Sequence, residues 1–391
     1  MANYRDIKGF TVQSLDADPI PYVGSWSSGG SLNTAKQNTG GAGTQTAGLA
    51  FGSFPTSATA ETYNGSAWTE TGDLTTAGGY FAGAFGTNTA AIGAGRLTSP
   101  TGRSGITESF DGTSWTETTD LNTTRTQGAG LGTSTAGFAV GGGTPSVVAN
   151  VESWNGTSWT ETTAINTARY ELGGNGTTTS ALVYAGEAGP GTTNITESWN
   201  GSSWTEVSDL NTTRQSTRGA GTSNSNALCI AGAVPPPGAV STVTESFDGT
   251  SWTEVNALST ARSNSSNSGP SNAVAMVAGG NPSLSATEEW NFPAITSNIL
   301  VEGQMWFNTP ASALKTYGTA AGVPTATWSS GGDLTSAGYS GAGFGTQTAA
   351  LMIGGTPRTA LNEEYNGSTW SEESDLNAGR TQFSGFGTTT A

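Results

Sequence analysis

The chain of 391 residues carries 13 Lys and Arg against 29 Asp and Glu, for a formal net charge of -16, and it contains no histidine. The negative charge opposes binding to nucleic-acid phosphates and to anionic membranes. The lack of histidine excludes Ser-His-Asp and Cys-His nucleophile systems and removes the commonest zinc ligand. We therefore expect no nucleic-acid partner, no metal and no cofactor.

The N-terminal segment, residues 1–21, is polar, and we predict that it is an anchoring arm. Its start, MANYRDIKGF, lacks the apolar core of a signal peptide. No stretch of the chain approaches the roughly 18 apolar residues of a membrane span. We predict neither a signal peptide nor membrane insertion, and release from a lysed cell stays open as a route to the outside.

Residues 22–292 consist of a repeated unit. Each unit reads SWTETTDLNTTR, a Gly-rich run, an apolar run that ends in glycine, a variable loop, and then VESWNG before the next TSWTE. Four short strands fit into each unit, and a period of 40 to 50 residues with four strands is typical of a β-propeller blade. The second tryptophan of the motif recurs every 42 to 48 residues, at Trp26, Trp68, Trp115, Trp159, Trp204 and Trp252.

We name the strands of a blade a to d from the central axis outward. Strand a is rich in Gly and Ala, as the crowding at an axis requires, and strand b is the apolar run between neighbouring blades. Cys229 lies in one such run, NALCIAGA, and is expected to be a buried small side chain. Strand d carries the repeated tryptophans, and an Asn-Gly or Asp-Gly pair joins c to d in five units. Strand c carries Tyr63, Phe110, Trp154, Trp199, Phe247 and Trp290.

The count of strands predicts six blades. The first repeat element, VGSWSSGG, is a d strand, and the last, ATEEWNF, is a c strand that Pro293 separates from any hairpin partner. The N-terminal strand with Trp26 should therefore pair with the strand of Trp290 and close the ring. A ring of seven blades that uses the later unit is the alternative.

Residues 293–327 interrupt the period, and the stretch EGQMWFNTPASALKTYG predicts a β-hairpin linker. Residues 328–391 then repeat the opening of the first propeller, with Trp328 and Trp370 again 42 positions apart. One blade cannot bury both of its faces. We expect either that the polypeptide continues past Ala391 into a second propeller or that this piece docks on another surface, and we favour continuation.

The order of glycine doublet, aromatic, tryptophan and Leu-x-x-x-Arg resembles the kelch repeat, as in GGG at 141–143, Trp154, Trp159 and INTAR at 165–169. The aromatic pair is closer than is usual in kelch repeats, and Ile165 replaces the Leu, so the units are kelch-like. Their wording also resembles repeats of structural proteins of tailed phages, especially those of marine cyanobacteria. The resemblance implies a virion component at the particle surface.

The repeated charged residues are interpreted as structural. Paired glutamates such as Glu152 and Glu161 recur in blade after blade, whereas catalysis needs one asymmetric constellation. We place these glutamates on a solvated outer edge and predict that no residue is catalytic. The acidic residues unique to one blade near the axis are Glu171 and Glu187. The repeated arginines are expected to bridge carbonyls or carboxylates between blades, at Arg125, Arg169, Arg214 and Arg262.

Recognition is expected on the loops between strands b and c, which vary while the c-to-d turns are uniform. By strand direction these loops share one face of the disc with the d-to-a connections. Two of them supply the candidate contact residues, which are Arg96, Arg103, Pro235, Pro236 and Pro237. A lectin would need exposed aromatic side chains there, and these loops contain only Phe54.

The sequence thus favours a non-enzymatic virion protein, a tail fibre or a surface decoration. We expect it to form a homo-oligomer and to contact other virion proteins and a host-surface protein or glycan. The alternative is a propeller that binds or degrades polysaccharide.

Overall fold

The computed structural model describes residues 24–55, 57–99, 102–189, 191–235 and 238–292, together with shorter pieces of the flanking segments. These pieces are residues 13–15, 20–21, 299–300, 305–308, 313–316, 342–346, 349–353, 360–365, 369–374, 376 and 378. The chain divides into two compact units, residues 1–317 and 318–391. The described residues form strands, turns and loops without a helix, and so include none that could cross a membrane.

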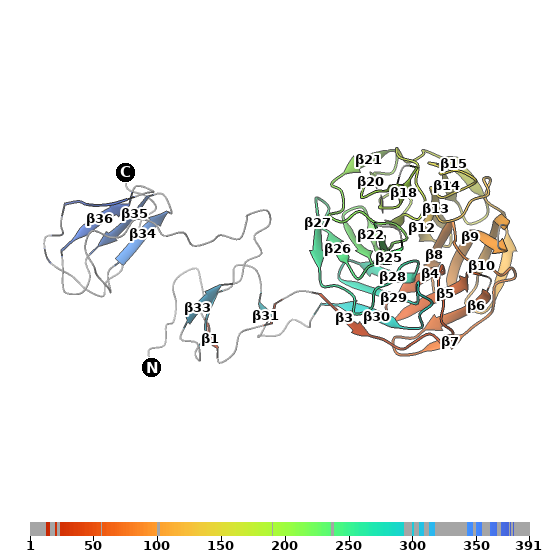
Figure 1. The fold of residues 1–391 in the computed structure, drawn as a ribbon, viewed down its shortest axis with the longest axis horizontal. Coiled ribbons are helices and arrows are strands. Elements are labelled where there is room, and N and C mark those ends of the chain that lie inside the picture. The colour runs from red at the N-terminus through yellow and green to blue at the C-terminus, as the bar shows by residue number, and fades with distance from the viewer. Residues whose placement is uncertain are drawn as a thin grey trace. The chain divides into compact units, whose positions relative to one another are not determined.

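Six four-stranded antiparallel sheets form a disc in the first unit, a β-propeller (Figure 1). Blades 1 to 3 contain β4 (Gly40–Thr44), β5 (Ala47–Ser53), β6 (Ser57–Tyr63), β7 (Trp68–Glu70); β8 (Gly83–Thr87), β9 (Ala90–Ser99), β10 (Gly102–Phe110), β11 (Trp115–Thr118); and β12 (Ala129–Thr133), β13 (Ala136–Val140), β14 (Val151–Trp154), β15 (Trp159–Thr162). Blades 4 and 5 contain β16 (Gly173–Gly176), β17 (Ala181–Tyr184), β20 (Thr196–Trp199), β21 (Trp204–Val207); and β22 (Arg218–Ser223), β23 (Asn226–Ile230), β26 (Thr244–Phe247), β27 (Trp252–Val255).

Blade 6 confirms the predicted closure. It consists of β28 (Ser266–Ser271), β29 (Val274–Ala278), β30 (Thr287–Asn291) and, as its outermost strand, β3 (Ser25–Ser28) from the start of the repeat region. Trp26 lies opposite Trp290 in this antiparallel pair. The N-terminal strand therefore replaces the missing d strand, and the ring has six blades rather than seven.

The innermost strands pack closely around the axis because they are rich in glycine. Each a strand contacts the next one around the ring, and β28 contacts β4, which closes the circle. A Cβ atom on Gly130 would lie 2.1 Å from the backbone nitrogen of Ala84 in the neighbouring blade. Glycine is thus required where the backbones of adjacent blades approach this closely.

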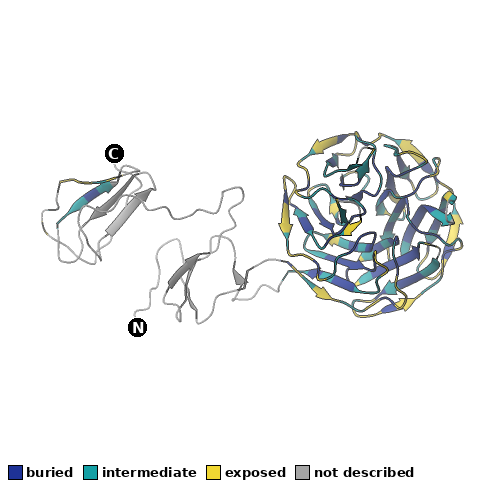
Figure 2. Cartoon of the chain, viewed as in Figure 1, coloured by how far each residue is buried: buried dark blue, intermediate teal, exposed yellow. Residues whose placement is uncertain are grey.

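The apolar core is divided among the six blade interfaces, with one buried cluster at each. The cluster between blades 3 and 4, for example, joins Phe138 and Val151 to Leu172 and Trp199. Burial is greatest on the b strands, and exposed residues lie on the d strands at the rim (Figure 2). Cys229 is fully buried, as predicted, and burial raises the pKa of its thiol to about 11.

The outer hairpin repeats with little variation. The aromatic residues of strands c and d stack in every blade, with ring centroids 5.1 Å apart for Trp154 and Trp159. The turn between them has four residues, and the side-chain oxygen of Asn155 accepts hydrogen bonds from the backbone amides of Thr157 and Ser158, both at 2.9 Å. Gly156 follows with a φ of 95°, where glycine is favoured. The Asn-Gly pair therefore fixes this turn: the Asn155 side chain binds two backbone amides, and Gly156 adopts the positive φ.

The d-strand tryptophans brace each blade against the preceding one. The Nε1 atom of Trp159 donates to the Thr107 hydroxyl of blade 2 at 3.1 Å, and the same bond joins Trp252 to Thr196 of blade 4. Blade 1 has Ala60 where the threonine would be, and the Nε1 of Trp115 is buried without a hydrogen-bond partner. Blade 3 also lacks the threonine, at Val151, but there Trp204 donates to the carbonyl of Thr163 at 3.1 Å instead.

Short strands of the arm and the linker pair with each other. β2 (Ile20–Pro21) runs parallel to β31 (Ile299–Leu300), and β1 (Gln13–Leu15) runs parallel to β32 (Met305–Asn308). β32 also pairs with β33 (Ala313–Thr316), which is the predicted hairpin. The parallel pairing of arm and linker was not predicted.

The described residues of the second unit form a four-stranded antiparallel sheet. Its strands are β34 (Ala342–Thr346), β35 (Ala349–Ile353), β36 (Asn362–Tyr365) and β37 (Trp370–Glu372). Tyr365 lies opposite Trp370, as the aromatic pairs of strands c and d do in the first unit. Trp328 lies outside the described residues.

Candidate functional site

The repeated glutamates of strand c are buried, which corrects the prediction of a solvated outer edge. In each blade of the ring one such glutamate pairs with a cation, an arrangement we call the carboxylate clamp. The side chain of Arg125 is 0% exposed and that of Glu152 is 2% exposed, with Nη2 and Oε1 3.3 Å apart. Only the d-strand partner, Glu161, is exposed. The six pairs are Lys36–Glu61, Arg96–Glu108, Arg125–Glu152, Arg169–Glu197, Arg214–Glu245 and Arg262–Glu288.

Each clamp fastens the connection that enters its blade. Glu152 accepts hydrogen bonds from the backbone amides of Asn122 at 2.8 Å and Thr123 at 3.2 Å, and Arg125 donates to the carbonyl of Ala139 at 3.1 Å. Burial lowers the pKa of Arg125 and the charge of Glu152 opposes that shift. The arginines bind carbonyls and carboxylates as predicted, but their partners lie in the blade that the connection enters, so the predicted bridge between blades is corrected. Because these charges are satisfied inside the protein, they are not available to a ligand.

Blade 2 builds its clamp from a different strand, and this corrects the assignment of Arg96 to a contact loop. The position that holds arginine in blade 3 is Gly78 in blade 2, and the guanidinium of Arg96 on β9 fills the space instead. It bonds to Glu108 at 2.7 Å and to the carbonyl of Thr76 at 2.9 Å, and it is 0% exposed. A Cβ atom on Gly78 would meet the Arg96 side chain at 2.9 Å. Arg96 is therefore a structural residue.

The other predicted contact residues lie on extensions of the b-to-c loops. Arg103 is exposed on β10, whose hairpin with β9 is longer than its counterparts in the other blades. Blade 5 adds a small hairpin of β24 (Ala233–Val234) and β25 (Ala239–Val240), with Pro235 exposed at its turn. Pro236 and Pro237 lie outside the described residues. Blade 4 has a similar hairpin, β18 (Glu187–Ala188) with β19 (Gly191–Thr192).

Six backbone hydrogen bonds form a closed circle on the same face, just before the a strands. The residue two positions after each clamp position donates its N–H to the carbonyl of its counterpart in the preceding blade, at 2.7 to 2.9 Å. All six residues have positive φ, between 51° and 60°. We call this circle the axial ring, and its members are Asn38, Tyr80, Gln127, Glu171, Ser216 and Asn264.

Glu171 is the only carboxylate of the axial ring. It is 9% exposed, and it accepts hydrogen bonds from Gln127 Nε2 at 2.6 Å and from the Ser216 hydroxyl. Burial raises the pKa of Glu171, while the hydrogen bonds from Ser216 and Gln127 and the charge of Arg218 act in the opposite direction. Its position near the axis agrees with the prediction.

Glu187 lies on the b-to-c hairpin of the same blade, beside the ring. Its backbone pairs with that of Tyr170, the residue before Glu171. Burial raises the pKa of the Tyr170 hydroxyl, and a hydrogen bond to Glu187 adds to the shift. Two carboxylates and a tyrosine therefore lie at one part of the ring.

Two aromatic side chains meet on this face. Phe54, from the b-to-c loop of blade 1, packs against Tyr80 of the axial ring with centroids 5.2 Å apart, and both are partly exposed. Phe54 was recognised in the sequence, but Tyr80 was missed because it lies in a d-to-a connection. Burial raises the pKa of Tyr80 and the charge of Glu171 adds to this.

Comparisons with known proteins give no relative to guide the assignment. No protein-family model matches the chain, and no curated protein matches it. Among the described residues, no group of three or more acidic or cysteine side chains is placed to hold a metal ion. The arrangement offers one face with varied loops around an axial ring of five residue types, on a scaffold whose repeated buried charges are paired.

Proposed function

We propose that this protein is a non-enzymatic structural component of a virus particle, a tail fibre or a surface decoration, and that its b-to-c face contacts a partner. The proposal rests on the kelch-like and phage-like wording of the repeats. One observation carries the recognition role: the clamps use the repeated charges for folding, while the b-to-c loops differ in length and form from blade to blade. A rigid scaffold with variable loops on one face favours binding over chemistry.

The location on a particle can be tested directly. Purified particles from cells that produce this chain would be labelled with an antibody against residues 24–292 and imaged by electron microscopy. Regular labelling at one site of the particle supports the proposal. Particles that lack the chain altogether would overturn it.

The recognition face can be tested with two matched variants. Arg103→Glu reverses an exposed charge on the b-to-c face, and Ser202→Glu adds a negative charge to a c-to-d turn, on the other face. We expect the Arg103 variant to weaken attachment to the particle or to host cells at least several-fold and the Ser202 variant to leave it unchanged. Equal effects of the two variants would contradict a specific face.

Polysaccharide binding is a second candidate, favoured by the contact of Phe54 with Tyr80 beside Glu171 and Glu187. Sugar rings stack on aromatic side chains while carboxylates accept their hydroxyl hydrogens. Binding of the protein to a glycan array, lost in Phe54→Ala and retained in Ser202→Glu, would favour this function over purely structural attachment.

A further inference from the structure

A small cavity lies on the axis of the propeller, directly inside the axial ring. Its volume is about 60 Å³, and strand-a regions of all six blades line it. Most of its lining is glycine, alanine or apolar side chain. Among the residues that line it, Arg218 carries the only charge.

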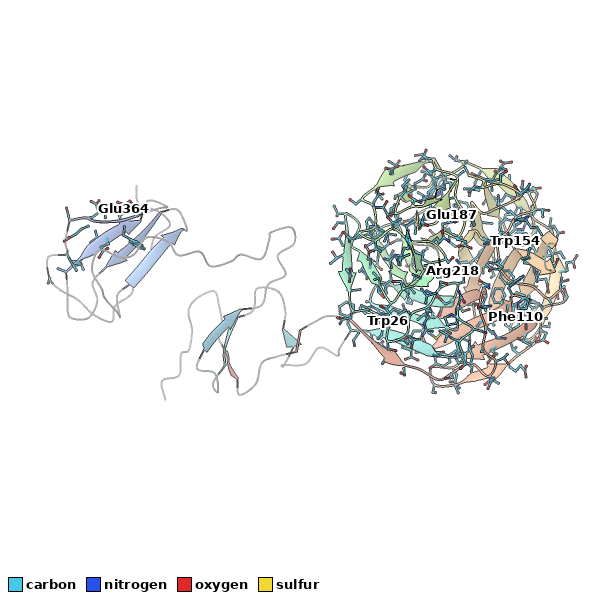
Figure 3. All side chains as sticks on the ribbon, in the orientation of Figure 1. Trp26, Phe110, Trp154, Glu187, Arg218 and Glu364 are labelled. Carbon is cyan, nitrogen blue, oxygen red and sulfur yellow. The ribbon has the colours of Figure 1, made fainter. Side chains whose placement is uncertain are left out.

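Arg218 differs from the six clamp cations because no carboxylate in the described part of the chain forms an ion pair with it, and the charge of Glu171 in the axial ring acts on it only from a longer distance. Among the described residues it takes part in no ion pair, and its hydrogen bond is donated by Nη1 to the carbonyl of Thr217 at 3.0 Å. It lies near the centre of the disc (Figure 3). A guanidinium has five N–H donors, and the hydrogen bond to Thr217 uses one of them. Arg218 is partly buried, so its charge is only partly solvated and the approach of an anion is favourable.

Two further residues with unpaired donors contribute to the lining of the same cavity. The Asn267 side-chain oxygen accepts a hydrogen bond from the Ser265 hydroxyl at 2.8 Å, which leaves its Nδ2 group buried without a protein partner. The hydroxyl of Thr39, a residue that is 2% exposed, is also buried without a protein partner. Asn267 and Thr39 thus line the cavity beside Arg218, and the described residues that line it include no carboxylate.

We propose that this cavity binds a small monovalent inorganic anion, such as chloride or bromide, held by Arg218 and enclosed by Asn267 and Thr39. A cavity of this volume has room for a monatomic anion with a few water molecules and none for a sugar or a nucleotide. The nearest opposing influence is Glu171 of the axial ring, whose negative charge acts on Arg218 and competes with the anion. The proposal is independent of any role in a particle.

The test uses bromide as the probe and the full chain as the protein. Crystals grown in sodium bromide should give an anomalous peak in the cavity beside Arg218, and crystals of Arg218→Met should not. In solution, the melting temperature in sodium bromide minus that in sodium gluconate of equal ionic strength should be more positive for the wild type than for Arg218→Met. Gluconate is too large for the cavity, and the general effects of the two salts on stability are shared by both proteins.

Two nearly isosteric variants keep the test decisive if Arg218→Met fails to fold. Asn267→Asp places a carboxylate in the cavity and should abolish the bromide peak. Glu171→Gln removes the competing charge and should tighten bromide binding several-fold. The proposal is overturned if wild-type crystals show no peak, if the peak persists in Asn267→Asp, if the bromide-minus-gluconate difference in melting temperature is no larger for the wild type than for Arg218→Met, or if Glu171→Gln binds bromide no better than the wild type.

Discussion

The clamps and the axial ring lie close together in the chain, yet they follow opposite rules. Gln127 of the ring lies two positions after Arg125 of a clamp, and the other blades keep this spacing except blade 2, whose cation comes from β9. The clamp repeats the same chemistry six times and buries it, whereas the ring repeats only its backbone and changes its side chain in five of six steps. Side chains that are buried and repeated from blade to blade stabilise the fold. Side chains that differ between blades, at positions with the same backbone conformation, are free to serve recognition.

The largest expected effect comes from breaking one clamp. Glu152→Ala leaves the guanidinium of Arg125 buried without its countercharge and two backbone amides without their acceptor. We expect a loss of roughly 3–5 kcal/mol in the free energy of unfolding, measured by urea denaturation followed by tryptophan fluorescence. The matched control is Glu161→Ala, directly opposite on strand d and exposed, which should stay within about 0.5 kcal/mol of the wild type. Similar losses for both would contradict the distinction between the two glutamates.

The clamp of blade 2 offers the next test, because its cation comes from strand b. Arg96→Met should cost about 3 kcal/mol of unfolding free energy, as expected when one partner of a buried ion pair is removed. Arg103→Met, from the same long hairpin but exposed, should change it by less than about 0.5 kcal/mol.

Returning the arginine to its usual position should not rescue Arg96→Met. A Cβ atom on Gly78 would lie 2.6 Å from the carbonyl oxygen of Leu97, so Gly78→Arg requires the backbone to move. Full recovery of stability in the double variant would show that the two positions are interchangeable and would contradict the steric account.

Blade number and closure could be predicted because they depend on residues that repeat. In the sequence, the strand of Trp290 lacks a hairpin partner, and the strand of Trp26 is a d strand with no blade of its own. These two exceptions together predict that the two strands pair. Burial of the c-strand glutamates could not be predicted from alternation, since in the stretch Val151–Trp154 the side chains of Val151, Glu152 and Trp154 are all buried. A strand packed on both faces hides the pattern that distinguishes inside from outside.

The role of Arg96 had a signal in the sequence. Blade 2 lacks an arginine at Gly78 and has one in an otherwise apolar b strand, a pair of exceptions that compensate each other. The axial ring had no such signal in the sequence. Its six residues share only their spacing, two positions after the clamp position. Arg218 could not be placed either, since nothing in GAGTS or its neighbours says that the adjacent blades leave a cavity beside it.

A change at the tryptophan hydrogen bonds between blades should have a smaller effect. It should raise the free energy of unfolding rather than lower it. Ala60→Thr should place a hydroxyl where Trp115 Nε1 has no hydrogen-bond partner, as Thr107 does for Trp159. We expect about 1 kcal/mol of added unfolding free energy. The matched control is Val151→Thr in blade 3, where Trp204 already donates to the carbonyl of Thr163 at 3.1 Å and no gain is expected. A gain in the control alone would contradict the account.

The smallest effect concerns Glu171 and depends on pH. Burial raises its pKa in the folded protein, so between the unfolded and folded values the folded state binds more protons, and stability falls as pH rises through this window. Glu171→Gln removes that loss, and it should be more stable than the wild type at neutral pH, with the difference shrinking to nothing below the unfolded value of about 4.3. The gain should be smaller than at Ala60, because Gln127, Ser216 and Arg218 already offset part of the burial. Melting temperatures measured from pH 4 to pH 8 check this, and a difference that grows toward acid would mean that the carboxylate is stabilised by its site. The same substitution should strengthen bromide binding. Glu171→Gln therefore tests two points: whether the buried carboxylate destabilises the fold at neutral pH, and whether its charge weakens anion binding at Arg218.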